Sequence, residues 1–162
     1  MPQGTMITSI CKFNDNITML PDQVFQICNA IALVGWLILI ILPRWYAADK
    51  FIIGIIITLF ALVYTWLLFT GFNLKDISAF GCLEGVMQLF HDPVMVTAGW
   101  VHYLAFDLLA GLFIRQNAQK HGISHWLVIP CLLLTFMFGP AGLLLYVLAR
   151  WIITKCYFAD NF

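Results

Sequence analysis

Long apolar runs separated by short polar segments dominate this 162-residue sequence. A helix that crosses a hydrocarbon core of roughly 30 Å needs about 20 mostly apolar residues. Pro43 ends the first apolar run, and Asp92-Pro93 is a typical helix start before the third. We expect four membrane-spanning helices, at residues 24–42, 51–70, 94–114 and 127–149.

The segment between the second and third expected spans has a different pattern. Its apolar side chains recur at helical spacing, with polar side chains on another side of the helix: Ile77, Phe80, Leu83, Met87 and Phe90. This pattern predicts an amphipathic helix at residues 77–90 that lies along the membrane interface. A loop packed on the mouth of the bundle is the alternative, because Gly81 and Gly85 lower helix propensity.

The expected fold is therefore an all-α integral membrane protein, a four-transmembrane-helix bundle with one interfacial helix. Residues 1–22 form an N-terminal segment, residues 23–150 the membrane domain and residues 151–162 a C-terminal tail. Composition agrees, because 62% of the residues are apolar, only 10% are charged and the mean hydropathy is +0.93. A soluble protein carries about a quarter charged residues, so the excess apolar surface must face lipid.

Charge and cysteine usage exclude several classes of function. The formal net charge is zero, which leaves no basic stripe for a nucleic acid. The five cysteines are scattered singly, and no group of His, Cys and carboxylate residues has metal-ligand spacing. We therefore expect no metal, no cofactor and no disulfide framework.

Basic residues do not distinguish the two sides of the expected bundle. Four would lie with the termini and four on the opposite side: Lys12, Lys75, Arg150 and Lys155 against Arg44, Lys50, Arg115 and Lys120. The second set lies in short loops near helix ends, where the positive-inside effect is strongest. This placement favours both termini facing away from the cytoplasm.

Two ionisable residues, His102 and Asp107, lie inside the third expected span. Such groups cost at least a few kcal/mol at the bilayer centre, and they are functional candidates by default. Five residues of helix separate their side chains by about 7.5 Å and about 140°, so they flank a stripe rather than touch each other. That stripe contains Gly99, Tyr103, Phe106 and Ala110.

We expect His102 and Asp107 to be a catalytic acid–base pair, with Tyr103 as the group that orients them. Burial favours the neutral forms of both side chains, and these can donate and accept protons. The alternative is that both are interhelical hydrogen-bonding groups. Their partners would then be Asn29, Thr58, Thr65 or Thr135 on neighbouring spans.

Aromatic and small residues inside the spans are candidates for binding a long, flat, apolar ligand. Pro140 should kink the fourth helix, and the glycines beside it would let a ligand or another backbone come close. Helix packing is the alternative for the rings and for the kink. The candidate substrate-binding residues are Trp36, Trp66, Gly99, Trp100, Phe106, Gly139, Pro140 and Gly142.

The runs WVHYLAFDLLAG at residues 100–111 and CLLLTFMFGPAGLLLY at residues 131–146 resemble the abscisic-acid-deficient-four-like family. The W-[VI]-H-x-L-x-x-D-L core and the P-x-G turn carry this resemblance, which extends more loosely over residues 22–150. Plant members of this family of small membrane proteins are implicated in forming neoxanthin from violaxanthin. The resemblance thus implies xanthophyll or related isoprenoid chemistry.

The resemblance also implies a location, since plant members have a long plastid-targeting extension that this chain lacks. We therefore expect a bacterial or cyanobacterial member, multi-pass in a bacterial inner (plasma) membrane or a thylakoid membrane. Its expected partners are membrane lipid and a carotenoid or related isoprenoid, and the sequence leaves a homo-oligomer open.

Three functional hypotheses follow. The first is an intramembrane isomerase of a carotenoid or carotenoid-derived polyene, either neoxanthin-synthase-like or cis–trans, working by acid–base chemistry. The second is a non-catalytic carotenoid- or isoprenoid-binding membrane protein that uses the same rings and glycines. The third is a small transporter in which Asp107 is coupled to protons, although only one span carries charge.

Overall fold

The computed structural model describes residues 19–42, 46–71 and 74–155 and is helical throughout, without a strand in these ranges. Its elements are α2 (Met19–Ile41), α3 (Tyr46–Phe51), the π-helical segment η1 (Ile52–Ile57), α4 (Thr58–Gly71), the 3-10 segment η2 (Leu74–Gly81), α5 (Leu83–Leu89), α6 (Pro93–Lys120), α7 (His125–Phe138) and α8 (Pro140–Thr154).

Three helical stretches within the described residues are long and apolar enough to cross a membrane. They cover Leu20–Ile41, Asp49–Gly71 and Pro93–Lys120, and they coincide closely with the first three expected spans. Helix α6 begins where the sequence predicts, because the Asp92 side chain accepts a hydrogen bond of 2.7 Å from the amide of Val94 and Pro93 takes the first helical position. It continues beyond the expected end at residue 114 to Lys120.

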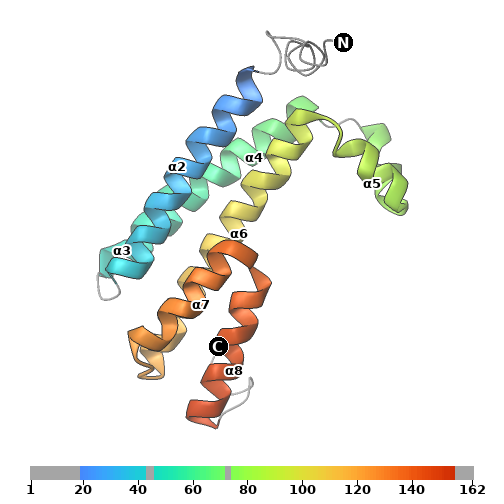
Figure 1. Ribbon diagram of the computed structural model, residues 1–162. Coiled ribbons are helices and arrows are strands. Elements are labelled where there is room, and N and C mark those ends of the chain that lie inside the picture. Colours follow the sequence, from blue (N-terminus) through green and yellow to red (C-terminus); the bar gives the residue numbers. More distant parts are fainter. Residues whose placement is uncertain (1–18, 43–45, 72–73, 156–162) are drawn as a thin grey trace, which may run out of the picture.

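The structure corrects the expectation of a fourth span, because residues 127–149 do not form one kinked helix. Helices α7 and α8 have 14 and 15 residues, about 21 and 23 Å, which is short of a bilayer core of roughly 30 Å. They meet at Gly139, whose φ of +43° ends α7, and Pro140 then opens α8. The two helices contact each other and run side by side as a hairpin (Figure 1). The four-span count is therefore not confirmed.

Hydrogen bonds place the α7–α8 hairpin against the other helices. Near its tip, the Tyr103 hydroxyl of α6 donates to the Met137 carbonyl over 3.2 Å. At its base, His125 Nε2 lies 2.8 Å from the Ile40 carbonyl at the end of α2. The tip therefore lies beside the middle of α6, and α8 returns to the end where α2 and α6 finish (Figure 1).

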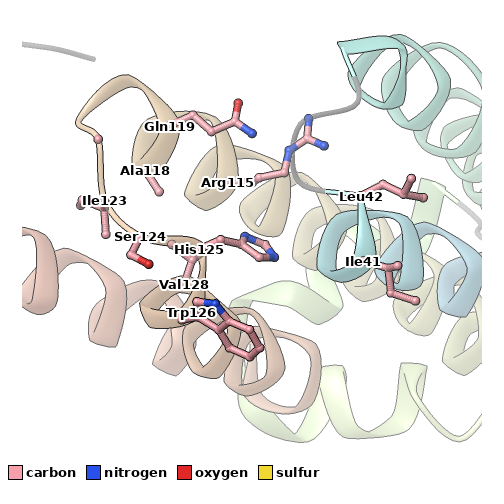
Figure 2. Close-up of a pocket in the computed structure, with 11 residues that line it drawn as sticks. Ile41, Leu42, Arg115, Ala118, Gln119, Ile123, Ser124, His125, Trp126 and Val128 are labelled. Atoms are coloured by element: carbon pink, nitrogen blue, oxygen red, sulfur yellow. The ribbon is translucent and has the colours of Figure 1, made fainter.

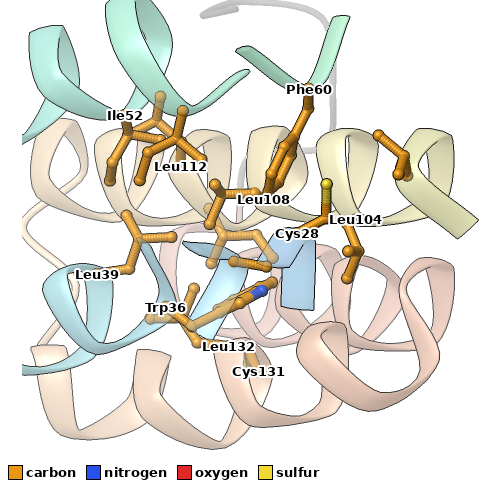
Figure 3. Packing of buried hydrophobic residues seen from close by; sticks show 14 of the residues in the cluster. Cys28, Trp36, Leu39, Ile52, Phe60, Leu104, Leu108, Leu112, Cys131 and Leu132 are labelled. Atoms are coloured by element: carbon orange, nitrogen blue, oxygen red, sulfur yellow. The ribbon is translucent and has the colours of Figure 1, made fainter. Parts of the chain in front are cut away.

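Helix α6 is the centre of the structure, since it contacts α2, α4, α7 and α8. Half of the residues in the most apolar stretch of α6 are buried, against 28% for α2 and 22% for the second span. A close approach to α2 depends on Gly111, because a Cβ there would lie 2.7 Å from the Trp36 ring. Figure 3 shows the core that results, with Trp36 beside Leu39 and Leu132 and with Phe60 reaching Leu108.

The segment expected as an interfacial helix at residues 77–90 is helical in two pieces, η2 and α5, which are separated at Cys82. These pieces contact mainly each other and extend away from the three long helices (Figure 1). Their large apolar side chains are exposed, among them Leu83 at 76%. The break fits the low helix propensity of the glycines on either side of Cys82. Placement at a membrane interface stays a prediction.

Candidate functional site

Asp107 lies buried in the middle of α6, with 7% of its surface exposed, and it faces the turn between α7 and α8. The carboxyl group lies so close to Gly139 that a Cβ at that position would collide with it. Its Oδ2 atom is buried and has no hydrogen-bond partner among the described residues. A carboxyl group therefore meets a break in the helical backbone, the kind of arrangement that membrane proteins use around functional sites.

Tyr103 and Trp100 connect Asp107 to a partly exposed aromatic surface. Tyr103 lies one helical turn before Asp107 on α6, and its hydroxyl donates a hydrogen bond to the Met137 carbonyl beside the turn that Asp107 faces. The Trp100 ring lies 5.4 Å from the Tyr103 ring and 5.4 Å from the Phe25 ring of α2. Trp100 also donates a 2.9 Å hydrogen bond to Asn29. We call Phe25, Trp100 and Tyr103 the aromatic row.

His102 lies on another face of α6 from Asp107, as the helical geometry requires. Its ring packs 4.5 Å from Phe106 and 5.4 Å from Tyr64 of α4. These three residues line a small cavity of about 210 Å³ between α4 and α6. The structure thus brings Tyr103 and Asp107 together and places His102 elsewhere.

The other candidate binding residues divide between packing and exposure. Trp36 is 2% exposed and contacts Phe136 edge-on at 5.5 Å, so it is part of the core. Gly142 allows α8 to approach Thr135 of α7, and Gly99 lies against the Phe90 ring. The remaining candidates are exposed on the outer surface: Trp66, Phe106 and Pro140.

A polar cluster that sequence reasoning did not single out lies at the far end of α6. Arg115 is 2% exposed and forms an ion pair with Asp49 of α3, which also accepts a 2.9 Å hydrogen bond from Gln116. The sequence analysis places Arg115 in a short loop near a helix end, whereas the structure places it inside α6. It is buried instead because α3 brings a carboxylate to it.

A second group beside this ion pair joins α6 to α8. Asn117 Oδ1 accepts hydrogen bonds from the Tyr146 hydroxyl at 2.7 Å and from Arg150 Nη1 at 3.1 Å. Arg150 is only 6% exposed, and its Nε has no hydrogen-bond partner among the described residues. Desolvation, followed by the charges of Arg150 and Lys120, lowers the pKa of His121 below its usual 6.5, so His121 is neutral at pH 7.

The largest cavity described here, about 890 Å³, opens at this same end of the molecule. In Figure 2, the His125 ring and the Arg115 guanidinium both point toward the end of α2, where Ile41 and Leu42 lie. This cavity is far along α6 from Asp107.

Within the described ranges, no group of three or more His, Cys, Asp or Glu residues could hold a metal ion.

One sequence signal could have revealed the polar cluster. Gly139 followed by Pro140 is a helix stop and a helix start in succession. If the chain reverses at these two residues, the following helix runs back and brings Arg150 to the end of the molecule that holds Arg115. Asp49 had no such signal, because nothing in the sequence around it indicates a buried partner.

Comparison with known protein families gives a match over most of the chain. The family model described as ABA DEFICIENT 4-like matches residues 23–146, which is most of the chain. No curated protein and no solved structure matches this chain.

Proposed function

Because the chain belongs to the ABA DEFICIENT 4-like family, we propose that it is an intramembrane isomerase of a carotenoid or carotenoid-derived polyene. Asp107 is the proton-transferring group, and Tyr103 orients it. The ligand enters sideways from the lipid and lies along the aromatic row. The observation that carries this proposal is the buried Asp107 carboxyl group, with one unpartnered oxygen, beside that row at the turn of the hairpin.

The environment of Asp107 supports proton transfer rather than a purely structural role. A structural carboxyl group in a membrane has its oxygens satisfied by donors on neighbouring helices. Oδ2 of Asp107 has no such partner among the described residues, although the residue is 7% exposed. A ligand that brings its own acceptor or acidic C–H bond would supply the partner that this buried oxygen lacks.

A neutral carboxyl group can perform both reactions under consideration. In a cis–trans isomerisation, Asp107 adds its proton to one carbon of the conjugated chain. A bond of the resulting delocalised cation rotates, and the proton returns to the carboxylate. In a neoxanthin-type isomerisation, the epoxide oxygen gains a proton while a carbon next to the polyene loses one. The two carboxyl oxygens give the first proton and take the second.

The separation of His102 from Asp107 changes the expected acid–base pair. His102 faces Tyr64 and Phe106 across the cavity of about 210 Å³, so one reacting centre does not contact both side chains in this arrangement. We therefore assign the proton transfer to Asp107. His102 becomes the residue whose replacement tests that assignment.

The test is expression in a carotenoid-producing host, with pigments analysed by chromatography and mass. We expect wild type to form an isomer of unchanged mass, Asp107→Asn to form none, and Tyr103→Phe to form at least about tenfold less, in line with the usual contribution of a positioned acid–base group. Asp22→Asn is the matched control, because it makes the same chemical change at an exposed position. It should leave product formation intact.

Two outcomes decide against parts of this proposal. Loss of product in His102→Ala as well as in Asp107→Asn would favour the original pair over Asp107 alone. An unchanged pigment profile, with carotenoid co-purifying with both wild type and Asp107→Asn, would favour the binding protein without chemistry. Each protein must first be shown to insert at the wild-type level.

A further inference from the structure

An apolar groove on the outer surface ends at the buried arginine of α8. The groove has a volume of about 540 Å³ and lies between η1, α6 and α8. Apolar side chains form most of it, including Ile53, Phe106, Leu109, Leu143 and Val147, while Gln116 and Arg150 supply its polar groups. We propose that this groove holds one anionic phospholipid, with the phosphate at Arg150 and an acyl chain along the apolar part.

The dimensions of the groove match one leaflet of a bilayer. Its lining on α6 runs from Phe106, at the middle of the helix, to Gln116 near the end. Ten residues of helix rise about 15 Å, which is half of a hydrocarbon core of roughly 30 Å. An acyl chain in the groove would therefore start at the headgroup level and reach the bilayer centre.

Arg150 is an unusual cation because it is buried and no carboxylate among the described residues pairs with it. It is 6% exposed, it donates one hydrogen bond to Asn117, and its Nε is unpartnered among the described residues. The nearby carboxylate of Asp49 forms its ion pair with Arg115. A buried charge without a partner destabilises the fold, and a phosphate oxygen would supply the missing partner.

The charge of the surrounding surface fits an anionic headgroup. Arg115 and Arg150 against Asp49 leave one positive charge in the cluster, and Asp49 is already engaged by Arg115 and Gln116. Lys50 and Lys120 lie at the same end. Basic pockets between transmembrane helices at one membrane face are typical binding sites for anionic lipid headgroups.

The charged end of the groove is separate from the proposed reaction site, because Gln116 and Asn117, the α6 residues beside Arg150, lie nine and ten helical residues, about 15 Å, beyond Asp107. We would purify the full chain in a mild detergent and measure lipid retention by native mass spectrometry. The probes are phosphatidylglycerol and phosphatidylcholine of the same chain length. We expect wild type to retain phosphatidylglycerol at least about tenfold better, as one charge-assisted hydrogen-bonded contact implies.

Three variants make the test specific. Arg150→Gln should abolish the preference for phosphatidylglycerol. Lys155→Gln removes a charge from an exposed residue of the same end and should keep the preference. Leu143→Phe fills the groove while leaving the arginine in place, so it should lower retention of phosphatidylglycerol. If Arg150→Gln fails to fold, Leu143→Phe still tests whether the groove holds the lipid.

Other results would overturn the proposal. Equal retention of the two lipids by wild type would exclude selection of an anionic headgroup. The same loss in Lys155→Gln as in Arg150→Gln would reduce the effect to general surface charge. If inorganic phosphate alone raises the melting temperature as much as phosphatidylglycerol does, the arginine is a free-anion site and the groove takes no part.

Discussion

Gly139 combines a backbone role and a packing role in one residue. Its φ of +43° and ψ of −96° turn the chain from α7 into α8, a conformation that favours glycine. Its missing side chain also leaves the space that the Asp107 carboxyl group occupies. The proposed site and the hairpin turn therefore depend on the same position.

A comparison of two glycines separates these roles. Gly122 also has a positive φ, of +66°, but a Cβ there would meet nothing within 4 Å. We expect Gly122→Ala to cost about 1 kcal/mol of unfolding free energy from backbone strain alone, and Gly139→Ala more than about 3 kcal/mol from strain plus collision. Unfolding in mixed detergent micelles measures both. Equal costs would contradict the contact between Gly139 and Asp107.

At the scale of elements, one ion pair joins α3 to α6. Asp49 lies in the short helix at the start of the second span, and Arg115 and Gln116 lie near the end of α6. Because Arg115 is 2% exposed, removal of its carboxylate partner leaves a buried charge. This contact fixes the connection between the first two spans against the central helix.

We expect Asp49→Asn to lower the unfolding free energy by about 2 kcal/mol, less than for a fully buried pair because Asp49 is 29% exposed. The double variant Asp49→Asn/Arg115→Met should recover part of this loss, since it removes the unpaired charge. The same micelle unfolding assay measures the two variants. A double variant less stable than Asp49→Asn would argue that Arg115 contributes through packing instead of charge.

At the scale of the whole molecule, the hairpin changes the distribution of charge between the two ends. Because α8 returns, five basic residues of the described chain share one end: Lys50, Arg115, Lys120, Arg150 and Lys155. The opposite end has the acidic residues Asp22, Glu84 and Asp92, with Lys75 and Asp76 in η2. The positive-inside rule then predicts that the basic end, with the end of α8, faces the cytoplasm. This replaces the orientation expected from four spans, with both termini facing away.

Two cysteines can distinguish the arrangements. Cys82 is exposed between η2 and α5, and Cys156 follows the end of α8 in the sequence. We expect a membrane-impermeant thiol reagent to label a variant that retains only Cys82 in intact bacterial cells. A variant that retains only Cys156 should need permeabilised cells. A four-span bundle places both cysteines on one side, so equal labelling in intact cells would restore it.

The sequence alone determined the features that depend on local chemistry. Helix periodicity, the Asp92-Pro93 start of α6 and the long apolar runs predicted an all-helical membrane protein, and the three longest helices follow that pattern. The motif around Trp100, His102 and Asp107 indicated the family, which the match over residues 23–146 confirms. Helical geometry also required His102 and Asp107 to face different ways.

Only the tertiary structure decided what those side chains face. Gly139-Pro140 fits either a kink or a reversal by local rules, and the choice depends on whether α8 packs back on α7 and α6. That packing brings Gly139 to Asp107 and Arg150 to Asn117, residues that lie far apart in the chain. Contacts between distant segments follow from the free energy of the whole packed arrangement, so no single stretch of sequence contains them.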